Sequence, residues 1–530
     1  MRFEPEFEFK VNTTLAIIVG YLAILILLGI ASRLFSRGTS SDYFVISRTV
    51  GPILLFLSIF GTTMTGFAIV GSTGKAYSTG IAVYGLMASW SALIHSAAFF
   101  LIGIPLWSIG KKHGLVTQCQ YFRERFDSPL LSHSLFPILV LLLIPYLLVG
   151  VISAGNFLQG TTAGMFPELF PIPVQVLADG SSAAHPLNGS LPAHWGGLLI
   201  CLVVLFYVFF GGLRGAVWAN ALQTIVFLCS GFVAFYLVSQ KLGGLSEASR
   251  LVAESPAARP RLVRQDAIGH LEFLSYGFIP LSIAMFPHIF QHWLTARSAR
   301  SFRLPIVAHP ICILLLWLPC ILIGIWAAAY LGPGKNPNVV LGVMVRELVE
   351  SPALTGLLAA GVLAAIMSSL DSQFVCLGTM FTHDVVIRVY KRELTEFQKI
   401  SIARCFIILV VAVTYAMSIW LKDRKEVFDL GVWCFSGFAS LFPVVFAALY
   451  WRRVSAAGAL SGVVVTAASW LYFFGASTAG VSAGSGEPLV YGMLPVAFMF
   501  TFSAIAVVGV SLLTKPPSAA VVDKFFSGRS

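Results

Sequence analysis

Charged residues are scarce in this sequence. Only 11% of its 530 residues are Asp, Glu, Lys or Arg, whereas 57% are hydrophobic. A soluble chain of this length needs a charged surface, so the composition excludes a soluble protein and indicates many transmembrane helices. Acidic residues are the scarcer charge, at 23 against 34 Lys and Arg. Because basic residues of membrane proteins concentrate in cytoplasmic loops, this excess gives no reason to expect a nucleic-acid partner.

Cysteine is scarce as well, and several common motifs are missing. The eight cysteines form no Cys-x-x-Cys pair, so we expect neither a disulfide framework nor a metal site of that kind. The segment Gly332–Asn336 lacks the Gly-Lys-Ser/Thr ending of a phosphate loop, so ATP-driven transport is not indicated. The chemistry-bearing residues do not suggest an enzyme, an organic cofactor or an obligate protein partner.

The apolar runs predict an all-α integral membrane protein with about thirteen transmembrane helices. Each run is long enough for a helix of about 20 residues to cross the hydrocarbon core. The first run lacks a small-residue cleavage site and is therefore expected to be a membrane helix, not a signal peptide. The predicted spans are 13–33, 51–72, 80–108, 130–158, 195–211, 217–240, 272–296, 305–330, 338–382, 401–420, 427–450, 455–475 and 490–514. The ninth run is longer than one crossing needs, so Asn338–Ser351 is expected to form a separate external segment.

The basic residues also predict an orientation in the membrane. With the N-terminus outside and the C-terminus in the cytoplasm, more than half of the 34 Lys and Arg residues fall on the cytoplasmic side. The external loops 160–194 and 475–492 then contain none. The loop 241–271 contains several, but longer translocated loops follow the rule less closely. We expect a multi-pass protein of the plasma, or inner, membrane.

The stretch Leu363–Asp371 is unusually polar for its place inside an apolar run. At about 100° per residue, a helix brings four small residues onto one face: Ala365, Ser368, Ser369 and Ser372. Such a stripe indicates either close helix packing or a cation site in which hydroxyl and carbonyl oxygens replace water. The acid Asp371 favours a functional role, because an ionisable residue inside the membrane is costly.

Two other spans contain signs of a broken helix. In Ser58–Gly74, four glycines interrupt a run that has three threonines near its middle. A break there would free carbonyl groups for cations and amide groups for a substrate, whereas tight helix packing is the alternative. The span 272–296 contains two prolines and two histidines, which are poor choices for a lipid-facing helix. A hinge lined by polar groups fits this composition better.

Five pieces of the chain, in order, resemble the sodium/solute symporter family. They are Asp42-Tyr-Phe with Arg48 and Gly51; Gly114, Thr117, Tyr121, Phe122, Arg125 and Phe126; Tyr207–Leu213 with Trp218 and Gln223; Phe435–Ala439 with Pro443; and Tyr450–Arg453 with Ala456–Ala459. The resemblance runs from about Ser40 to Thr466. It implies a LeuT-type core of two inverted five-helix repeats, whose first and sixth core helices are broken.

The family core divides the chain into five parts. The resemblance implies an extra helix with the first cytoplasmic loop at 1–50 and the first repeat at 51–240. An external loop at 241–271 separates this repeat from the second, at 272–450. Two extra helices and a short cytoplasmic tail then occupy 451–530.

The resemblance also implies cation sites. The family's sodium ligands, carried over position by position, are the carbonyl groups of Gly61, Met64 and Ala365 and the hydroxyl groups of Ser368 and Ser369. Family members often have Asp where this chain has Asn220, and many have a small residue where it has Asp371. We therefore hypothesise a second cation site, or a proton site, that includes Asp371, Ser372 and Asn220. The alternative is a carboxylate that only forms a hydrogen bond to a neighbouring helix.

The implied substrate site lies at the membrane midplane between the broken helices. The candidate residues are Thr62, Thr63, Thr65, Ser91, His95, Phe286, His288, Gln291 and Phe435. Thr63 is neutral where some relatives have an acid or an amide, which weakens an amino-acid interpretation. Phe286-Pro-His288 resembles members that carry carboxylates, including pantothenate, proline and short monocarboxylates.

These features together predict a sodium-coupled symporter that works by alternating access, without a cofactor. The expected substrate is a small polar organic solute, and a carboxylate is favoured slightly. A sugar, polyol or amino-acid symporter of the same family is the alternative. A transporter-like sensor that binds ligand without coupled uptake is the rival from another class.

Overall fold

The computed structural model describes residues 12–34, 39–173, 175–176, 182–183, 185–264, 268–390, 394–421, 426–478 and 489–526. Helices make up almost all of its regular structure, as the composition predicted. The strands of this described part are the two-residue β1 (Gln175–Val176) and β2 (Ser182–Ala183), which pair antiparallel. Most of the predicted loop 475–492 lies outside the described residues.

Two bent helices occur where the sequence predicted breaks. In the first, α3 (Pro52–Thr63) ends before an extended Met64, and η2 (Phe67–Gly71) leads into α4 (Ser72–Thr79) after a bend of 57°. In the second, α11 (His270–Tyr276) and η5 (Ile279–Ala284) are bent by 49° against α12 (Pro287–Thr295). Pro287 can begin α12, because a helix's first turn needs no intrahelical N–H, but it cannot continue the helix before it.

Further helices follow each bend, some long and apolar and others of only one or two turns. After α4 come α5 (Ala82–Ala98), η3 (Phe99–Gly103), α6 (Ile104–His113), α7 (Gln118–Phe126), α8 (Pro129–Thr161) and α9 (Ala193–Lys241). After α12 come η6 (Ala299–Phe302), α13 (Arg303–Tyr330), η7 (Pro337–Val339), α14 (Val340–Leu348), α15 (Pro352–Met380), η8 (Phe381–Val386), α16 (Ile387–Tyr390), α17 (Glu396–Leu421), α18 (Val427–Ser440) and α19 (Phe442–Tyr450). The other helices are α1 (Thr13–Leu34), α2 (Ser40–Val45), η1 (Ile46–Arg48), α10 (Leu245–Glu254), η4 (Arg259–Leu262), α20 (Ala456–Thr478), α21 (Pro495–Leu513) and α22 (Ala519–Phe526).

The predicted count of thirteen spans is not confirmed by the length and composition of the helices. In the described part of the chain, ten helices are long and apolar enough to cross a membrane, or up to twelve if each bent pair is one span. The predicted spans 195–211 and 217–240 both fall within the 49 residues of α9. Gly212 lies between the two predicted runs and is not helical, with φ +54° and ψ −147°, so α9 consists of two helices that meet at a kink. The ninth run does divide as predicted, because α14 ends before Pro352 opens α15.

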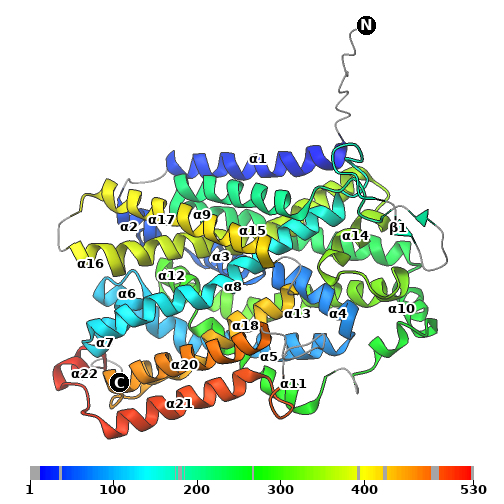
Figure 1. The fold of residues 1–530 in the computed structure, drawn as a ribbon. Helices are drawn as coiled ribbons and strands as arrows, with labels where there is room; N and C mark the ends of the chain where they lie inside the picture. Colours follow the sequence, from blue (N-terminus) through cyan, green and yellow to red (C-terminus); the bar gives the residue numbers. More distant parts are fainter. Residues whose placement is uncertain are drawn as a thin grey trace.

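Helix α15 lies among the other helices and is largely buried. It contacts α9, α1, α8 and α17 along its length, and Figure 1 shows it inside the bundle. Two glycines allow these close approaches. A Cβ at Gly361 would lie 2.3 Å from Ser230 Cβ of α9, and one at Gly378 would lie 2.8 Å from Ile407 of α17. Some of the small residues on α15 therefore serve helix packing.

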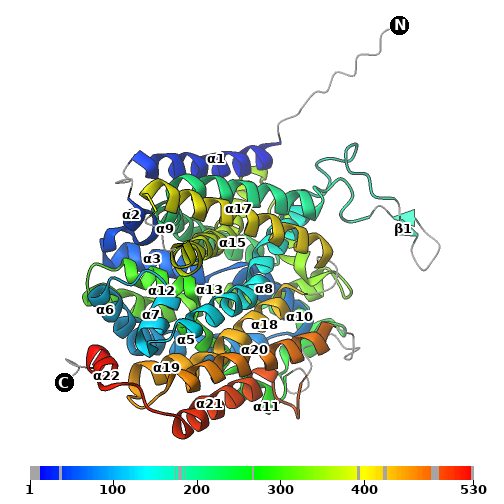
Figure 2. The ribbon, with the colours of Figure 1, turned by 60° about the vertical axis from the view of Figure 1, so that its left-hand side comes forward.

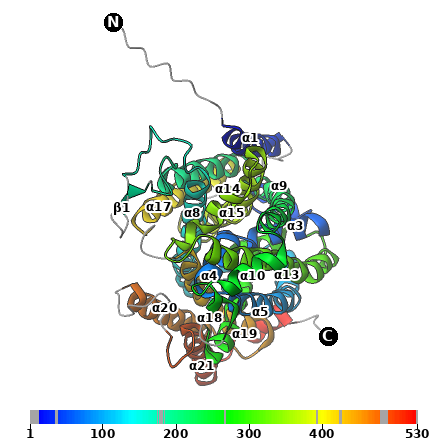
Figure 3. The same ribbon diagram turned by 90° about the vertical axis from the view of Figure 1, so that its right-hand side faces the viewer.

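The connecting segments gather at two opposite ends of the bundle (Figure 1 and Figure 2). At one end lie β1 and α10, which belong to the predicted external loops 160–194 and 241–271. At the other end lie α2, α7, α16 and α22, from segments predicted to be cytoplasmic. Figure 3 looks onto the first end, where α10 packs against α13. Helix α1 begins at that same end, and α22, the last described helix, lies at the other.

Gly324 of α13 provides a stability test of this packing. A Cβ at Gly324 would lie 2.3 Å from the Thr73 carbonyl oxygen of α4, a backbone atom that can move only with its helix. We expect Gly324→Ala to reduce the free energy of unfolding by about 1–3 kcal/mol, as overpacking does. Thermal unfolding of the purified protein in detergent measures this loss. Gly509→Ala is the matched control, because nothing lies within 4 Å of that Cβ. Equal melting temperatures for the two variants would contradict the prediction.

Candidate functional site

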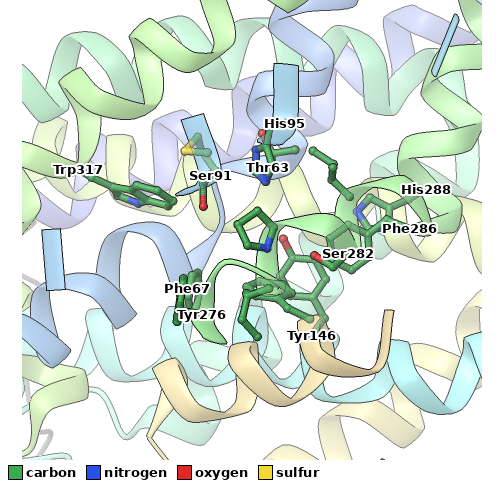
Figure 4. Close-up of a pocket in the computed structure, with 15 residues that line it drawn as sticks. Thr63, Phe67, Ser91, His95, Tyr146, Tyr276, Ser282, Phe286, His288 and Trp317 are labelled. Carbon is green, nitrogen blue, oxygen red and sulfur yellow. The ribbon is translucent and has the colours of Figure 1, made fainter. Parts of the chain in front are cut away.

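The two helix breaks line a single cavity (Figure 4). Met64 and Phe67 come from the first break, and Ile283 and Phe286 from the second. The space enclosed is about 480 Å³, including its opening to solvent. The other lining residues are Thr63, Ser91, His95, Tyr146, Tyr276, Ile279, Pro280, Ser282, His288, Trp317 and Phe435. None of these residues is Asp, Glu, Lys or Arg, so the cavity wall has no permanently charged side chain.

Polar and aromatic groups occupy different parts of the cavity. Figure 4 shows Thr63 and His95 close together, whereas Tyr146, Phe286 and His288 form a separate group. In that group the rings of Tyr146 and Phe286 are 5.4 Å apart, and those of Phe286 and His288 are 5.1 Å apart. His288 is 1% exposed, and neither ring nitrogen has a hydrogen-bond partner among the described residues. Buried polar groups are rarely left unpaired, so a ligand or water is expected to bond to this imidazole.

Six of the predicted substrate residues line this cavity: Thr63, Ser91, His95, Phe286, His288 and Phe435. The other three do not. Thr62 is fully buried away from the cavity, and the Thr65 hydroxyl accepts a hydrogen bond from the Phe67 backbone N–H, 3.1 Å away. The Gln291 amide donates to Phe44 O at 2.8 Å and to Thr379 Oγ1 at 2.9 Å. Neighbouring residues of a helix point in different directions, so only one of these threonines faces the cavity.

Of the five predicted sodium ligands, Gly61 of α3 and Ala365 and Ser368 of α15 are in contact. Ser368 Oγ lies 2.8 Å from Gly61 O and 2.9 Å from Ala365 O. Ser369 Oγ donates to Ile366 O at 3.0 Å, one turn back along α15. Ala365, Ser368 and Ser369 are at most 2% exposed, and Gly61 is buried. The last turn of α3 and the serine face of α15 therefore present hydroxyl and carbonyl oxygens to each other.

The residues of the hypothesised second site also meet. Asn220 Nδ2 of α9 donates to Ser372 Oγ at 2.9 Å, and Ser372 Oγ lies 3.0 Å from Asp371 Oδ1. The Tyr207 hydroxyl donates to the other carboxylate oxygen, at 2.9 Å. Asp371 is fully buried, and these partners are hydroxyl groups, not a cationic side chain. The site is an acid held by neutral groups between α9 and α15.

The predicted site residues did not include several residues of this region. His309 of α13 lies 3.0 Å from Thr63 Oγ1 through Nε2, although 246 positions separate them in the chain. His292 bridges Ser58 Oγ at 2.7 Å and Ser372 Oγ at 2.9 Å. Tyr146 enters the cavity from the long helix α8. His292 is one of the two histidines that indicated a polar hinge in 272–296, whereas nothing in the local spacing of His309 or Tyr146 distinguishes them from other polar residues of apolar helices.

Comparison with known proteins places most of the chain in one sequence family. The profile described as "Sodium:solute symporter family" matches residues 43–166 and 182–466. The high-affinity proline transporter PutP of Bacillus subtilis is 24% identical over 92% of this chain and 95% of its own length. A sodium/proline symporter of Staphylococcus aureus is 25% identical over 96% of this chain and 94% of its own length.

Solved structures show the same fold. A sodium-coupled sialic acid symporter, in a substrate-bound outward-open state, superimposes with a TM-score of 0.73. The match covers 96% of this chain and 99% of that one, at 18% identity. The nucleobase-cation symporter Mhp1 superimposes with a TM-score of 0.53 at 16% identity, over 92% of this chain and 96% of its own. At these identities the similarity establishes the fold and leaves the substrate open.

Proposed function

Because the chain belongs to the sodium:solute symporter family, we propose that it takes up a small zwitterionic amino acid, of the proline type, together with sodium. Membership of this family makes it a sodium-coupled membrane transporter and not an enzyme, with sodium as the coupling ion. The observation that carries the substrate proposal is the uncharged cavity between the two helix breaks. A wall without fixed charge suits a solute of no net charge, because an unpaired ion would be costly to desolvate there.

The expectation of a simple carboxylate is not supported. The curated relatives are proline transporters at 24% and 25% identity, which favours the amino-acid alternative. The sequence argument against an amino acid relied on the neutrality of Thr63. That argument was weak, because a zwitterion carries its own counter-charge and needs hydrogen bonds more than a charged partner.

We propose the oxygens of Gly61, Met64, Ala365, Ser368 and Ser369 as the sodium site. Neutral hard oxygens suit a monovalent cation that must also be released. The contact of Ser368 with the Gly61 carbonyl supports this assignment. Sodium bound there would hold the end of α3 against α15 and thereby stabilise one arrangement of the broken helix.

A second cation site at Asp371, Ser372 and Asn220 is proposed from the contacts of these three residues. The sialic acid symporter with the same fold is described as having a novel sodium site, so an additional site has a precedent in this fold. The cluster adjoins the sodium site within α15, since Ser372 is one turn beyond Ser368. In the cell membrane, the orientation proposed from the basic loops puts the β1 and α10 end outside.

Uptake into proteoliposomes tests the proposed function. We expect radiolabelled L-proline to accumulate under an inward sodium gradient, and not under an equal gradient of potassium or choline. Competition by unlabelled solutes should rank amino acids above simple carboxylates, sugars and polyols. Sodium-driven uptake of another class in place of proline would disprove the substrate, and uptake independent of sodium would argue against a conventional coupled symporter.

A further inference from the structure

A histidine outside the cavity holds one of the hydroxyl groups that line it. His309 of α13 is fully buried, and its Nε2 lies 3.0 Å from Thr63 Oγ1. Thr63 is the last residue of α3 and is only partly buried, because it also lines the cavity. We infer that His309 fixes the Thr63 hydroxyl as a hydrogen-bond acceptor toward the substrate, so that this part of the cavity selects a donor group such as an ammonium.

The direction of each hydrogen bond follows from counting protons. Thr63 Oγ1 lies 2.9 Å from Phe60 O, and because a carbonyl oxygen can only accept, the hydroxyl donates its proton there. A hydroxyl has no second proton, so in the contact with His309 it must be the acceptor. This arrangement assigns the Nε2–H tautomer to His309. Its Nδ1 is buried without a hydrogen-bond partner among the described residues. In this tautomer Nδ1 carries only a lone pair, so no donor is left unpaired.

The surroundings keep His309 from turning. The ring of Phe60 lies 5.3 Å from the imidazole at 81°, and that of Phe99 lies 5.0 Å from it at 85°. Edge-to-face contacts at these distances are favourable and fix the plane of the ring. Phe60 O also accepts the backbone N–H of Met64 at 3.0 Å, so the proton of Thr63 is used in closing the last turn of α3. The hydroxyl thus cannot rotate without losing bonds on both sides.

The consequence concerns the kind of group that can bind beside Thr63. A hydroxyl oxygen accepts two hydrogen bonds, and His309 takes one of these positions. The other is left for a ligand in the cavity, and it can receive only a donor. A carboxylate oxygen at this point would meet an oxygen lone pair. This inference rests on the proposed amino-acid substrate and deepens it, because it assigns the substrate's N–H group to the Thr63 part of the cavity.

Paired substitutions test the inference through substrate selection. The probes are L-proline and cyclopentanecarboxylate, which lacks the ring N–H but has a similar shape. We expect wild-type protein to prefer L-proline, and Thr63→Val or His309→Leu to reduce this preference about 10-fold or more. His309→Gln and Thr63→Ser are the matched controls, because the first keeps a donor and the second keeps a hydroxyl. Both should retain most of the preference for L-proline. The double variant Thr63→Val/His309→Leu should lose no more of this preference than either single variant, since both substitutions remove the same hydrogen bond.

The effect should appear in the KM for L-proline, while the sodium concentration for half-maximal uptake stays unchanged. Equal losses in His309→Gln and His309→Leu, or additive losses in the double variant, would show that His309 only fills space. A second measurement does not depend on transport. The nitrogen magnetic resonance spectrum of protein labelled in histidine, with His309→Gln to identify the signal, should show the Nε2–H tautomer. An Nδ1–H tautomer would overturn the inference. Failure of the wild type to carry L-proline would instead reject the proposed substrate, and the spectrum would still decide the polarity of Thr63.

Discussion

Ser368→Ala is expected to abolish the response of this protein to sodium. Ser368 Oγ is the proposed ligand that lies nearest to the opposite helix, 2.8 Å from Gly61 O. Its removal takes an oxygen from the site and also the contact between α15 and the end of α3. We expect sodium affinity to fall about 100-fold, which corresponds to roughly 2.7 kcal/mol.

Thermal stability reports this loss before any substrate is known. A ligand present at 100 times its dissociation constant stabilises the folded state by about 2.7 kcal/mol, and at its dissociation constant by only about 0.4 kcal/mol. Wild-type protein should therefore unfold at a higher temperature in sodium than in potassium or choline, and Ser368→Ala should lose that difference. Sodium-driven uptake should fall with it.

A buried serine elsewhere provides the control for Ser368. Ser440 is fully buried, and its hydroxyl donates to Ser436 O in the preceding turn at 2.8 Å. Ser440→Ala removes the same atoms from a helix that has no proposed cation ligand, so its response to sodium should match the wild type. If Ser368→Ala kept its sodium-specific stabilisation, the proposed site would have to be abandoned.

Asp371→Asn is expected to remove one sodium ion from the transport cycle. Asparagine has nearly the shape of aspartate but no charge, so it can accept from Tyr207 without attracting a cation. We expect charge moved per substrate to fall by one elementary charge, and the dependence of uptake on sodium concentration to become less steep. Current and tracer flux measured on the same proteoliposomes would give this ratio.

Tyr207→Phe separates this hypothesis from its structural alternative. If the only role of Asp371 is to accept the hydrogen bond from Tyr207 of α9, Tyr207→Phe should cause the same defects as Asp371→Asn. If the carboxylate holds a cation, Tyr207→Phe should keep the stoichiometry of the wild type. Asp384→Asn serves as the control for a buried acid, because Asp384 instead bonds Thr117 Oγ1 at 2.9 Å. An unchanged stoichiometry in Asp371→Asn would eliminate the second cation site.

The sequence predicted the features that depend on local spacing. The serine face of α15 follows from the helical repeat, and the broken helices follow from glycine and proline, which weaken a helix at known positions. The family resemblance then paired Gly61 with Ser368, and the structure brings these two residues into contact. The predicted division between 195–211 and 217–240 coincides with the kink at Gly212, where two helices of α9 meet without a connecting loop.

The direction in which a side chain faces at a helix break could not be predicted from local spacing. At a helix break the rotation between the two parts is set by packing, so three nearby threonines gave no indication of which one faces the cavity. Gln291 lies three residues after His288, a spacing that often means a shared face, yet its amide reaches Phe44 of α2. The contact of His309 with Thr63 joins residues from the two halves of the chain and has no local signature.

The cavity wall has no charged side chain and therefore suits a solute of no net charge. This has an electrical consequence. A zwitterionic solute adds no net charge to the loaded transporter, so the current that accompanies uptake counts the co-transported cations alone. Each such charge couples the cycle to the membrane potential by about 2.3 kcal/mol per 100 mV. A cell would then set how steeply it concentrates the proposed substrate by its voltage, through the number of cations bound at the proposed sites.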